Sequence, residues 1–103
     1  MAGFTKVADV DDVPVGEVRV FVVGGFGVAV ANVGGTFYAI DDVCSHDGGP
    51  LGEGRLFGDQ VECPRHGARF DVKTGRPRTL PAVIPVRSYP VEVEGDEVMV
   101  DVG

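Results

Sequence analysis

Basic residues are scarce in this sequence, and their scarcity excludes one large class of function. Nine Lys and Arg stand against sixteen Asp and Glu, so the formal net charge is −7 at pH 7. Proteins that bind nucleic acids contact phosphates through Lys and Arg and need the opposite sign. We therefore expect no nucleic-acid partner. An acidic surface instead favours solubility and steers a protein toward positively charged protein partners.

Long apolar runs are also missing. The longest stretch without an internal charged residue, Val20 to Asp41, is interrupted by the pairs Gly24–Gly25 and Gly34–Gly35. Glycine pairs at this spacing indicate hairpin turns, and the apolar pieces between them are too short to cross a bilayer. The first six residues lack the basic patch and apolar core of a signal peptide. We expect a cytoplasmic protein that does not associate with membranes.

A sustained 3.6-residue apolar period is the third missing feature, so we expect no helices. Short segments rich in Val, Ile, Phe and Tyr alternate instead with Gly-rich turns, which is typical of strands. We expect strands at residues 17–23, 27–33, 36–40, 60–63, 68–72, 86–94 and 97–102. The first three form a meander, the last two a hairpin that turns at Gly95–Asp96, and residues 76–85 are irregular because they carry three prolines.

These segments predict an all-β fold, a small antiparallel barrel or sandwich. The length of 103 residues suits a single domain over residues 1–103. Between two of the strands we expect an inserted subdomain of two loops, at about residues 41–72.

Only two cysteines and two histidines occur, and all four lie in these loops as Cys44-x-His46 and Cys63-x-x-His66. A zinc site is one alternative, although zinc fingers usually pair two cysteines in a knuckle and place two histidines on a helix. A Cys44–Cys63 disulfide is another, although cytoplasmic proteins more often use such cysteines for metals or catalysis. One thiolate and one imidazole from each loop suit a two-iron cluster in which one iron binds both cysteines and the other both histidines.

The residues around these four side chains resemble the two cluster-binding boxes of Rieske ferredoxins, the small electron carriers of bacterial aromatic-ring-hydroxylating dioxygenase systems. The matching segments are residues 42–51, Asp-Val-Cys-Ser-His-Asp-Gly-Gly-Pro-Leu, and residues 63–71, Cys-Pro-Arg-His-Gly-Ala-Arg-Phe-Asp. The resemblance extends over nearly the whole chain. It implies a Rieske-like fold with one [2Fe–2S] cluster, held by Cys44, His46, Cys63 and His66.

The resemblance also gives roles to the residues that flank the ligands. Four glycines let the backbone approach the cluster and take a positive φ where needed, although an ordinary turn explains any one of them equally well: Gly48, Gly49, Gly52 and Gly67. Pro64 stiffens the second loop. Leu51 and Leu80 are expected either to shield the cluster from water or to be ordinary core residues.

Two departures from the respiratory-chain Rieske proteins bear on the redox potential. Gly49 and Arg65 stand where those proteins have a disulfide that braces the cluster. Ala68 and Phe70 stand where they have a serine and a tyrosine that donate hydrogen bonds to the cluster and its cysteine ligand. Fewer hydrogen bonds to sulfur stabilise the added electron less, so we expect a midpoint toward the lower end of roughly −150 to +300 mV.

The expected function is one-electron transfer from an NAD(P)H-dependent flavoprotein reductase to a terminal oxygenase, by a monomer that is not itself an enzyme. The chain has no room for a flavin or nicotinamide site, and Gly24-Gly25-Phe26-Gly27 fails as a dinucleotide motif because no helix follows it. Docking is expected at the loop tip, whose side chains are His46, His66, Arg65, Arg69, Asp47 and Glu53. Two alternatives stay open: a Rieske-like small subunit of a larger reductase, such as assimilatory nitrite reductase, and a zinc-stabilised interaction module.

Overall fold

The computed structural model describes residues 3–43, 51–52, 54–64, 67–78 and 84–102. Ten strands form three antiparallel sheets. The first sheet has the order β1-β10-β9, with β1 (Phe4–Asp9), β9 (Val91–Glu94) and β10 (Glu97–Asp101). The second has the order β2-β3-β4-β8, with β2 (Val18–Val23), β3 (Phe26–Val33), β4 (Thr36–Asp41) and β8 (Ser88–Tyr89). The third contains β5 (Arg55–Phe57), β6 (Gln60–Glu62) and β7 (Arg69–Asp71).

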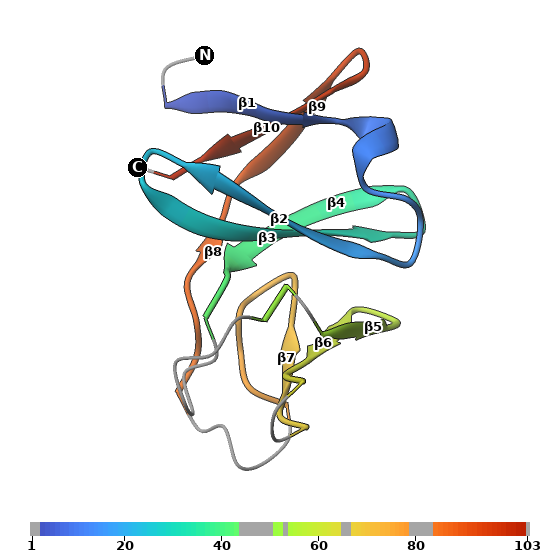
Figure 1. Ribbon diagram of the computed structural model, residues 1–103, viewed down its shortest axis with the longest axis vertical. Helices are drawn as coiled ribbons and strands as arrows, with labels where there is room; N and C mark the ends of the chain where they lie inside the picture. Colours follow the sequence, from blue (N-terminus) through green and yellow to red (C-terminus); the bar gives the residue numbers. More distant parts are fainter. Residues whose placement is uncertain (1–2, 44–50, 53, 65–66, 79–83, 103) are drawn as a thin grey trace.

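The sheets are stacked along the longest dimension of the molecule, whose principal extents are 38 × 26 × 18 Å. Figure 1 shows the first two sheets packed on each other at one end and the third sheet at the other. We call the first two sheets the sandwich, and the described residues from 51 to 78, which include the third sheet, the small lobe. The prediction of an all-β antiparallel fold is confirmed. The described residues contain no helix long and apolar enough to span a bilayer.

Glycine pairs form the hairpins of the sandwich. Val23 pairs with Phe26 across Gly24–Gly25, and Val33 pairs with Thr36 across Gly34–Gly35. All four glycines have φ between 56° and 97°. Two-residue hairpin loops of this kind need a positive φ at both positions, which side chains disfavour. The predicted meander β2-β3-β4 and the closing hairpin β9-β10 are therefore confirmed.

The predicted strand at residues 86–94 is wrong, because the chain changes sheets within it. Ser88 and Tyr89 pair with β4 in the sandwich's second sheet, whereas Val91 begins a strand in the first sheet. Pro90 lies between the two; it has no N–H for a sheet ladder, and its carbonyl accepts from Asp101 N at 3.1 Å. Sequence reasoning also left three described elements unassigned: β1, β5 and the 3-10 turn η1 (Val10–Asp12).

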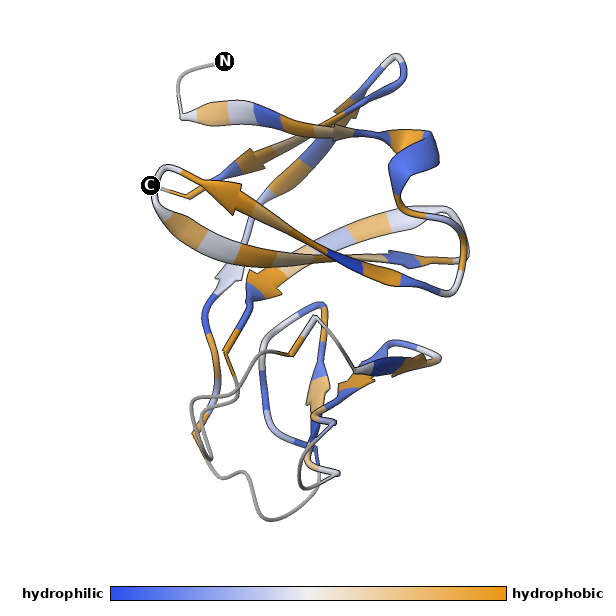
Figure 2. Cartoon of the chain, in the orientation of Figure 1, coloured by the Kyte–Doolittle hydropathy of each residue, from blue (hydrophilic) through white to orange (hydrophobic). Residues whose placement is uncertain are grey.

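Two separate apolar cores result from this stacking. Figure 2 shows hydrophobic residues alternating with hydrophilic ones along the strands of the sandwich. One lies within the sandwich, and its fully buried members include Val28, Val30, Val98 and Val100. The other joins the second sheet to the small lobe, through residues that include Ala29, Ile40, Leu51, Val61, Cys63 and Phe70. The small lobe is thus packed on the sandwich through its own core.

Candidate metal centre

Cys63 is the expected metal ligand that lies within the described residues. Cys44, His46 and His66 lie outside them, and so do six other residues named above: Asp47, Gly48, Gly49, Glu53, Arg65 and Leu80. Because three of the four expected ligands fall outside, the described residues alone contain no group of three His, Cys, Asp or Glu that could hold a metal ion.

A tight turn after β6 positions Cys63. Its N–H donates to the carbonyl of Ala68 at 2.6 Å, and its carbonyl accepts from the N–H of Gly67 at 3.0 Å. Gly67 has a φ of +75°, a conformation that a residue with a Cβ takes only with strain. The positive φ expected at this glycine is therefore present, and it lets the chain return directly into β7.

The side chain of Cys63 belongs to an apolar environment. Cys63 is 1% exposed, and Leu51, Ala68 and Phe70 in the same core are fully buried. It is a free cysteine, and no described residue makes a hydrogen bond to its sulfur. A soft sulfur donor beside an apolar core suits an iron–sulfur cluster. Leu51 is a member of this core, which agrees with one of its two expected roles, that of an ordinary core residue.

Ala68 and Phe70 form an apolar wall beside Cys63, and both are fully buried. Neither side chain carries a donor, so this wall cannot stabilise negative charge on sulfur through a hydroxyl. Burial among apolar side chains also disfavours added charge. Both effects would lower the redox potential of a cluster bound to Cys63. The low potential remains a prediction.

The segment after β7 runs back along this wall. Pro77 forms an isolated bridge with Phe70, and Arg78 N–H donates to the carbonyl of Arg69 at 2.7 Å. Asp71 N–H donates to the carbonyl of Arg76 at 2.8 Å. The start of the proline-rich segment is thus irregular and ordered, as expected, and it holds Phe70 in place.

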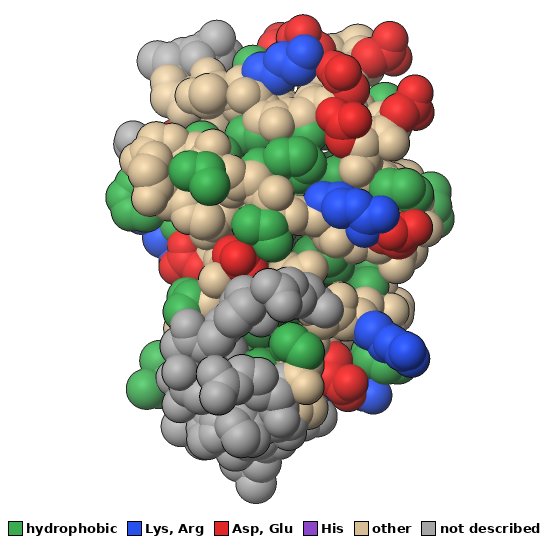
Figure 3. Space-filling view, in the orientation of Figure 1, with side chains coloured by type: hydrophobic (Ala, Val, Ile, Leu, Met, Phe, Trp, Pro, Cys, Tyr) green, Lys and Arg blue, Asp and Glu red, His purple; other side chains and the backbone are tan. Residues whose placement is uncertain are grey.

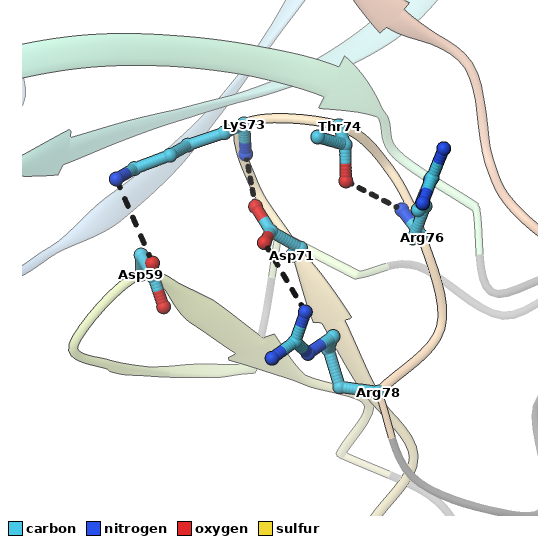
Figure 4. Close-up of polar contacts among 6 residues, drawn as sticks. All are labelled: Asp59, Asp71, Lys73, Thr74, Arg76 and Arg78. Atoms are coloured by element: carbon cyan, nitrogen blue, oxygen red, sulfur yellow. Dashed lines mark hydrogen bonds and ion pairs between the residues drawn. The ribbon is translucent and has the colours of Figure 1, made fainter.

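Side-chain contacts fix the turn that leads into this segment (Figure 4). Asp71 accepts from the backbone N–H of Lys73 at 2.8 Å and lies 3.9 Å from Arg78 Nη1. The ammonium of Lys73 lies 3.7 Å from Asp59, and Thr74 Oγ1 accepts from Arg76 N–H at 3.2 Å. These contacts couple the loop before β6 to the segment after β7.

Arg69 is one of the residues expected at the docking tip. Its Nε lies 3.2 Å from Glu62, and its guanidinium lies over the ring of Phe57, 4.2 Å from the centroid. Its charge is therefore partly compensated within the small lobe.

Two chain crossings connect the small lobe to the sandwich, at residues 41–42 and 86–88, and we call them the neck. Asp41 N–H donates to the carbonyl of Arg87 at 2.9 Å, and the hydroxyl of Tyr89 donates to the Asp41 carboxylate. Burial, together with this carboxylate, raises the pKa of Tyr89 to about 12. The Tyr89–Asp41 contact joins the outgoing crossing to the returning one, and sequence spacing gave no sign of it.

Two glycines of the small lobe allow close packing, one against the sandwich and one within the lobe itself. A Cβ at Gly52 would lie 1.9 Å from Val20 Cγ2, and its N–H donates to Asp42 Oδ1 at 2.6 Å. Gly52 does not have a positive φ. Of its two expected roles, the structure therefore shows close backbone approach, here to β2. A Cβ at Gly54 would lie 1.7 Å from the carbonyl oxygen of Glu62. Sequence reasoning gave Gly54 no role, since an isolated glycine carries no spacing signal.

Comparison with known proteins shows what this arrangement is similar to. Residues 3–90 match the family model described as the Rieske [2Fe-2S] domain. The ferredoxin component of biphenyl 2,3-dioxygenase from Rhodococcus jostii (strain RHA1) is 45% identical over 97 residues, covering 94% of this chain and 91% of the relative.

Solved structures give the same result. The ferredoxin of carbazole 1,9a-dioxygenase from Nocardioides aromaticivorans IC177 superposes with a TM-score of 0.93 at 40% identity, covering 97% of this chain and 98% of that one. A chain from a complex of reduced oxygenase and oxidised ferredoxin in carbazole 1,9a-dioxygenase gives 0.89 at 41% identity, covering 98% and 94%. The fold is also that of a nitrite reductase small subunit, which is 18% identical. The TM-score is 0.81, over 94% of this chain and 96% of that one.

Proposed function

We propose, from the premise that this chain belongs to the Rieske [2Fe–2S] domain family, that it carries single electrons from an NAD(P)H-dependent flavoprotein reductase to a terminal oxygenase. The observation that carries the proposal is the biphenyl-dioxygenase relative, a ferredoxin component 45% identical over nearly the length of both chains. The nitrite-reductase alternative rests on a likeness of 18% identity, which concerns the fold alone.

Four residues of this chain are proposed to hold the cluster. Cys44 and Cys63 bind one iron and His46 and His66 the other. The bound cluster supplies a one-electron couple. Cys63 fits this role because its thiol is buried and has no hydrogen-bond or disulfide partner among the described residues.

The surrounding residues of the chain exclude water and restrict movement. Leu51, Ala68 and Phe70 belong to the buried core that contains Cys63, and the backbone of Pro77 forms an isolated antiparallel bridge with that of Phe70. A rigid site changes little between oxidised and reduced states, and small reorganisation favours fast electron transfer. This chain provides positioning and a dry environment, and the proposed role needs no substrate pocket.

Metal analysis tests the cofactor. We expect two irons and two acid-labile sulfides per chain, with a red-brown visible spectrum that bleaches on reduction. A colourless protein that binds zinc would support the interaction module and overturn the electron-carrier role.

Stopped-flow mixing tests the electron transfer. The wild-type chain is reduced by a flavoprotein reductase and NADH and then mixed with the oxygenase component of a biphenyl or carbazole system. We expect the visible absorbance to recover as the oxygenase accepts electrons. Failure with every such oxygenase, together with co-purification with a large catalytic chain, would favour the reductase-subunit alternative.

The remaining assignments belong to the same proposal. We propose a cytoplasmic monomer whose 103 residues form one domain, with the cluster-binding subdomain at about residues 41–72. Sedimentation velocity tests the monomer, and a single thermal transition seen by both circular dichroism and cluster absorbance tests the single domain.

A further inference from the structure

The β2–β3 hairpin exposes apolar side chains that the proposed function does not use. Phe26, directly after the Gly24–Gly25 turn, is 49% exposed, and Val22 on the neighbouring strand is 78% exposed. Val23 pairs with Phe26 and Val22 pairs with Gly27, so the side chains of Phe26 and Val22 lie on opposite faces of the hairpin. A large apolar side chain that is exposed beside a groove is typical of protein contact sites.

This hairpin contacts the crossing that leads into the first cluster loop. Gly27 carbonyl accepts from Asp42 N–H at 3.0 Å. A groove of about 290 Å³ lies beside this contact, lined by Gly25, Phe26, Gly27, Asp41, Asp42 and Val43. Val43 is 37% exposed and is bonded directly to Cys44, a proposed iron ligand. In Figure 1 the hairpin and the end of β4 lie on the same side of the molecule.

The lining of the groove combines apolar rims with negative charge. Phe26 and Val43 provide apolar surface, and Asp41 and Asp42 provide two carboxylates. One oxygen of Asp41 accepts from Tyr89, and one of Asp42 accepts from Gly52 N–H. No Lys or Arg among the described residues forms an ion pair with either carboxylate. The groove is therefore suited to an apolar side chain that has a cationic neighbour.

We propose that this groove is a docking site for the terminal oxygenase, which places there an apolar side chain next to a Lys or Arg. The inference rests on the proposed function. The oxygenase is the chosen occupant because a solved relative, 41% identical, comes from a complex of an oxygenase with a ferredoxin. The proposed interface runs from Val43 to the β2–β3 hairpin.

Charge-inserting variants of Phe26 test the site, with Val93 as a matched control. Val93 is 46% exposed and lies on β9, in the first sheet of the sandwich. The variants are Phe26→Lys, Phe26→Glu, Val93→Lys and Val93→Glu. Each is checked for wild-type iron content, visible spectrum and midpoint potential, because Phe26 has no proposed role in holding the cluster. Phe26→Ala serves if a charged variant does not fold.

The measurement is the second-order rate of oxidation by the oxygenase component that accepts electrons from the wild-type chain. We expect Phe26→Lys to lower this rate about tenfold, since it removes apolar contact and repels the cation. Phe26→Glu attracts the cation and should lower it about threefold. The Val93 variants should stay within about twofold of the wild type.

Each other outcome overturns part or all of the proposal. Equal effects at Phe26 and Val93, or none at Phe26, would show that the groove does not dock the oxygenase. A larger effect for Phe26→Glu than for Phe26→Lys would rule out a cationic neighbour. Slower reduction by the reductase with unchanged oxidation would assign the groove to the reductase. The proposed function is tested separately, by electron transfer from the wild-type chain to the oxygenase. That measurement does not depend on how the variant rates compare with one another.

Discussion

The sandwich and the cluster-bearing part of the chain differ in charge as well as in structure. Residues 1–43 and 84–103 carry eleven Asp and Glu against three Lys and Arg, a net charge of −8. Residues 44–83 carry five against six, a net charge of +1. Figure 3 shows acidic side chains gathered at the sandwich end, where β1, η1 and the β9–β10 hairpin meet.

Their means of stabilisation differ too. The sandwich is built from strands of up to eight residues joined by tight hairpins, whereas no strand of the small lobe exceeds three residues. The lobe depends instead on its core with the second sheet, on close glycine packing and on turns. The comparison teaches that the net negative charge belongs to the part of the chain outside residues 44–83, and Asp41 and Asp42 of the groove are included in it. The following predictions test how independent the two parts are.

The largest effect should come from Cys63→Ala. We expect iron and sulfide content to fall roughly tenfold or more, because one of four proposed ligands is lost. The sandwich should keep its β-sheet circular dichroism, since its own core contains no residue of the small lobe. Loss of the whole β-sheet signal would show that the sandwich does not stay folded without the bound cluster.

Gly54→Ala should come next. Its Cβ would lie 1.7 Å from the carbonyl oxygen of Glu62, and backbone cannot move away cheaply. We expect the free energy of unfolding to fall by about 3 kcal/mol in urea denaturation. Gly27→Ala is the control, because its Cβ would meet Asp42 Cβ at 3.5 Å without a positive φ. A change beyond about 0.5 kcal/mol in the control would contradict the packing argument.

Truncation of one valine in each core separates the two parts further. Val61 and Val98 are both fully buried, one in each core. Each change to alanine should lower the free energy of unfolding by about 2 kcal/mol. Only Val61→Ala should speed release of iron to a chelator, because only Val61 shares a core with Cys63. Equal release rates would mean that cluster retention follows overall stability.

Hydroxyls beside Cys63 should raise the redox potential. Phe70→Tyr and Ala68→Ser each add a donor to the wall of the proposed site. If that donor stabilises the reduced state by about 1.4 kcal/mol, the one-electron midpoint rises by about 60 mV. Redox titration measures the shift, and Val98→Thr in the other core should leave the midpoint unchanged. A lower midpoint in both wall variants would refute the hydrogen-bond explanation of the low potential.

The smallest effect concerns the neck at high pH. The folded pKa of Tyr89, about 12, is above its unfolded value of 10.0, so the folded state holds the proton more tightly. This contribution is fully present below pH 10 and is lost as pH rises toward 12. Denaturation at several pH values should show the loss, and Tyr89→Phe should remove that part of the pH dependence. An unchanged slope in Tyr89→Phe would mean that another group is responsible.

The sequence predicted what local patterns determine. Gly24–Gly25 and Gly34–Gly35 specify hairpins through backbone freedom, and alternating valines specify the closing hairpin, so these were found. The sheet change at Pro90 was missed because Val86 to Glu94 alternates well enough for one strand, and only tertiary pairing separates its halves. Cys63 was identified from its partners in sequence, whereas Gly54 and the Tyr89–Asp41 contact depend on segments brought together by folding.

The unequal distribution of charge has a consequence for work on electrodes. A film of cationic polymer will attract the −8 end and hold the molecule upright, with the proposed cluster facing away along a 38 Å axis. Electron tunnelling weakens steeply with distance, so such a film should give little current even from intact protein. A neutral or weakly anionic film reverses the preference and should give the larger signal.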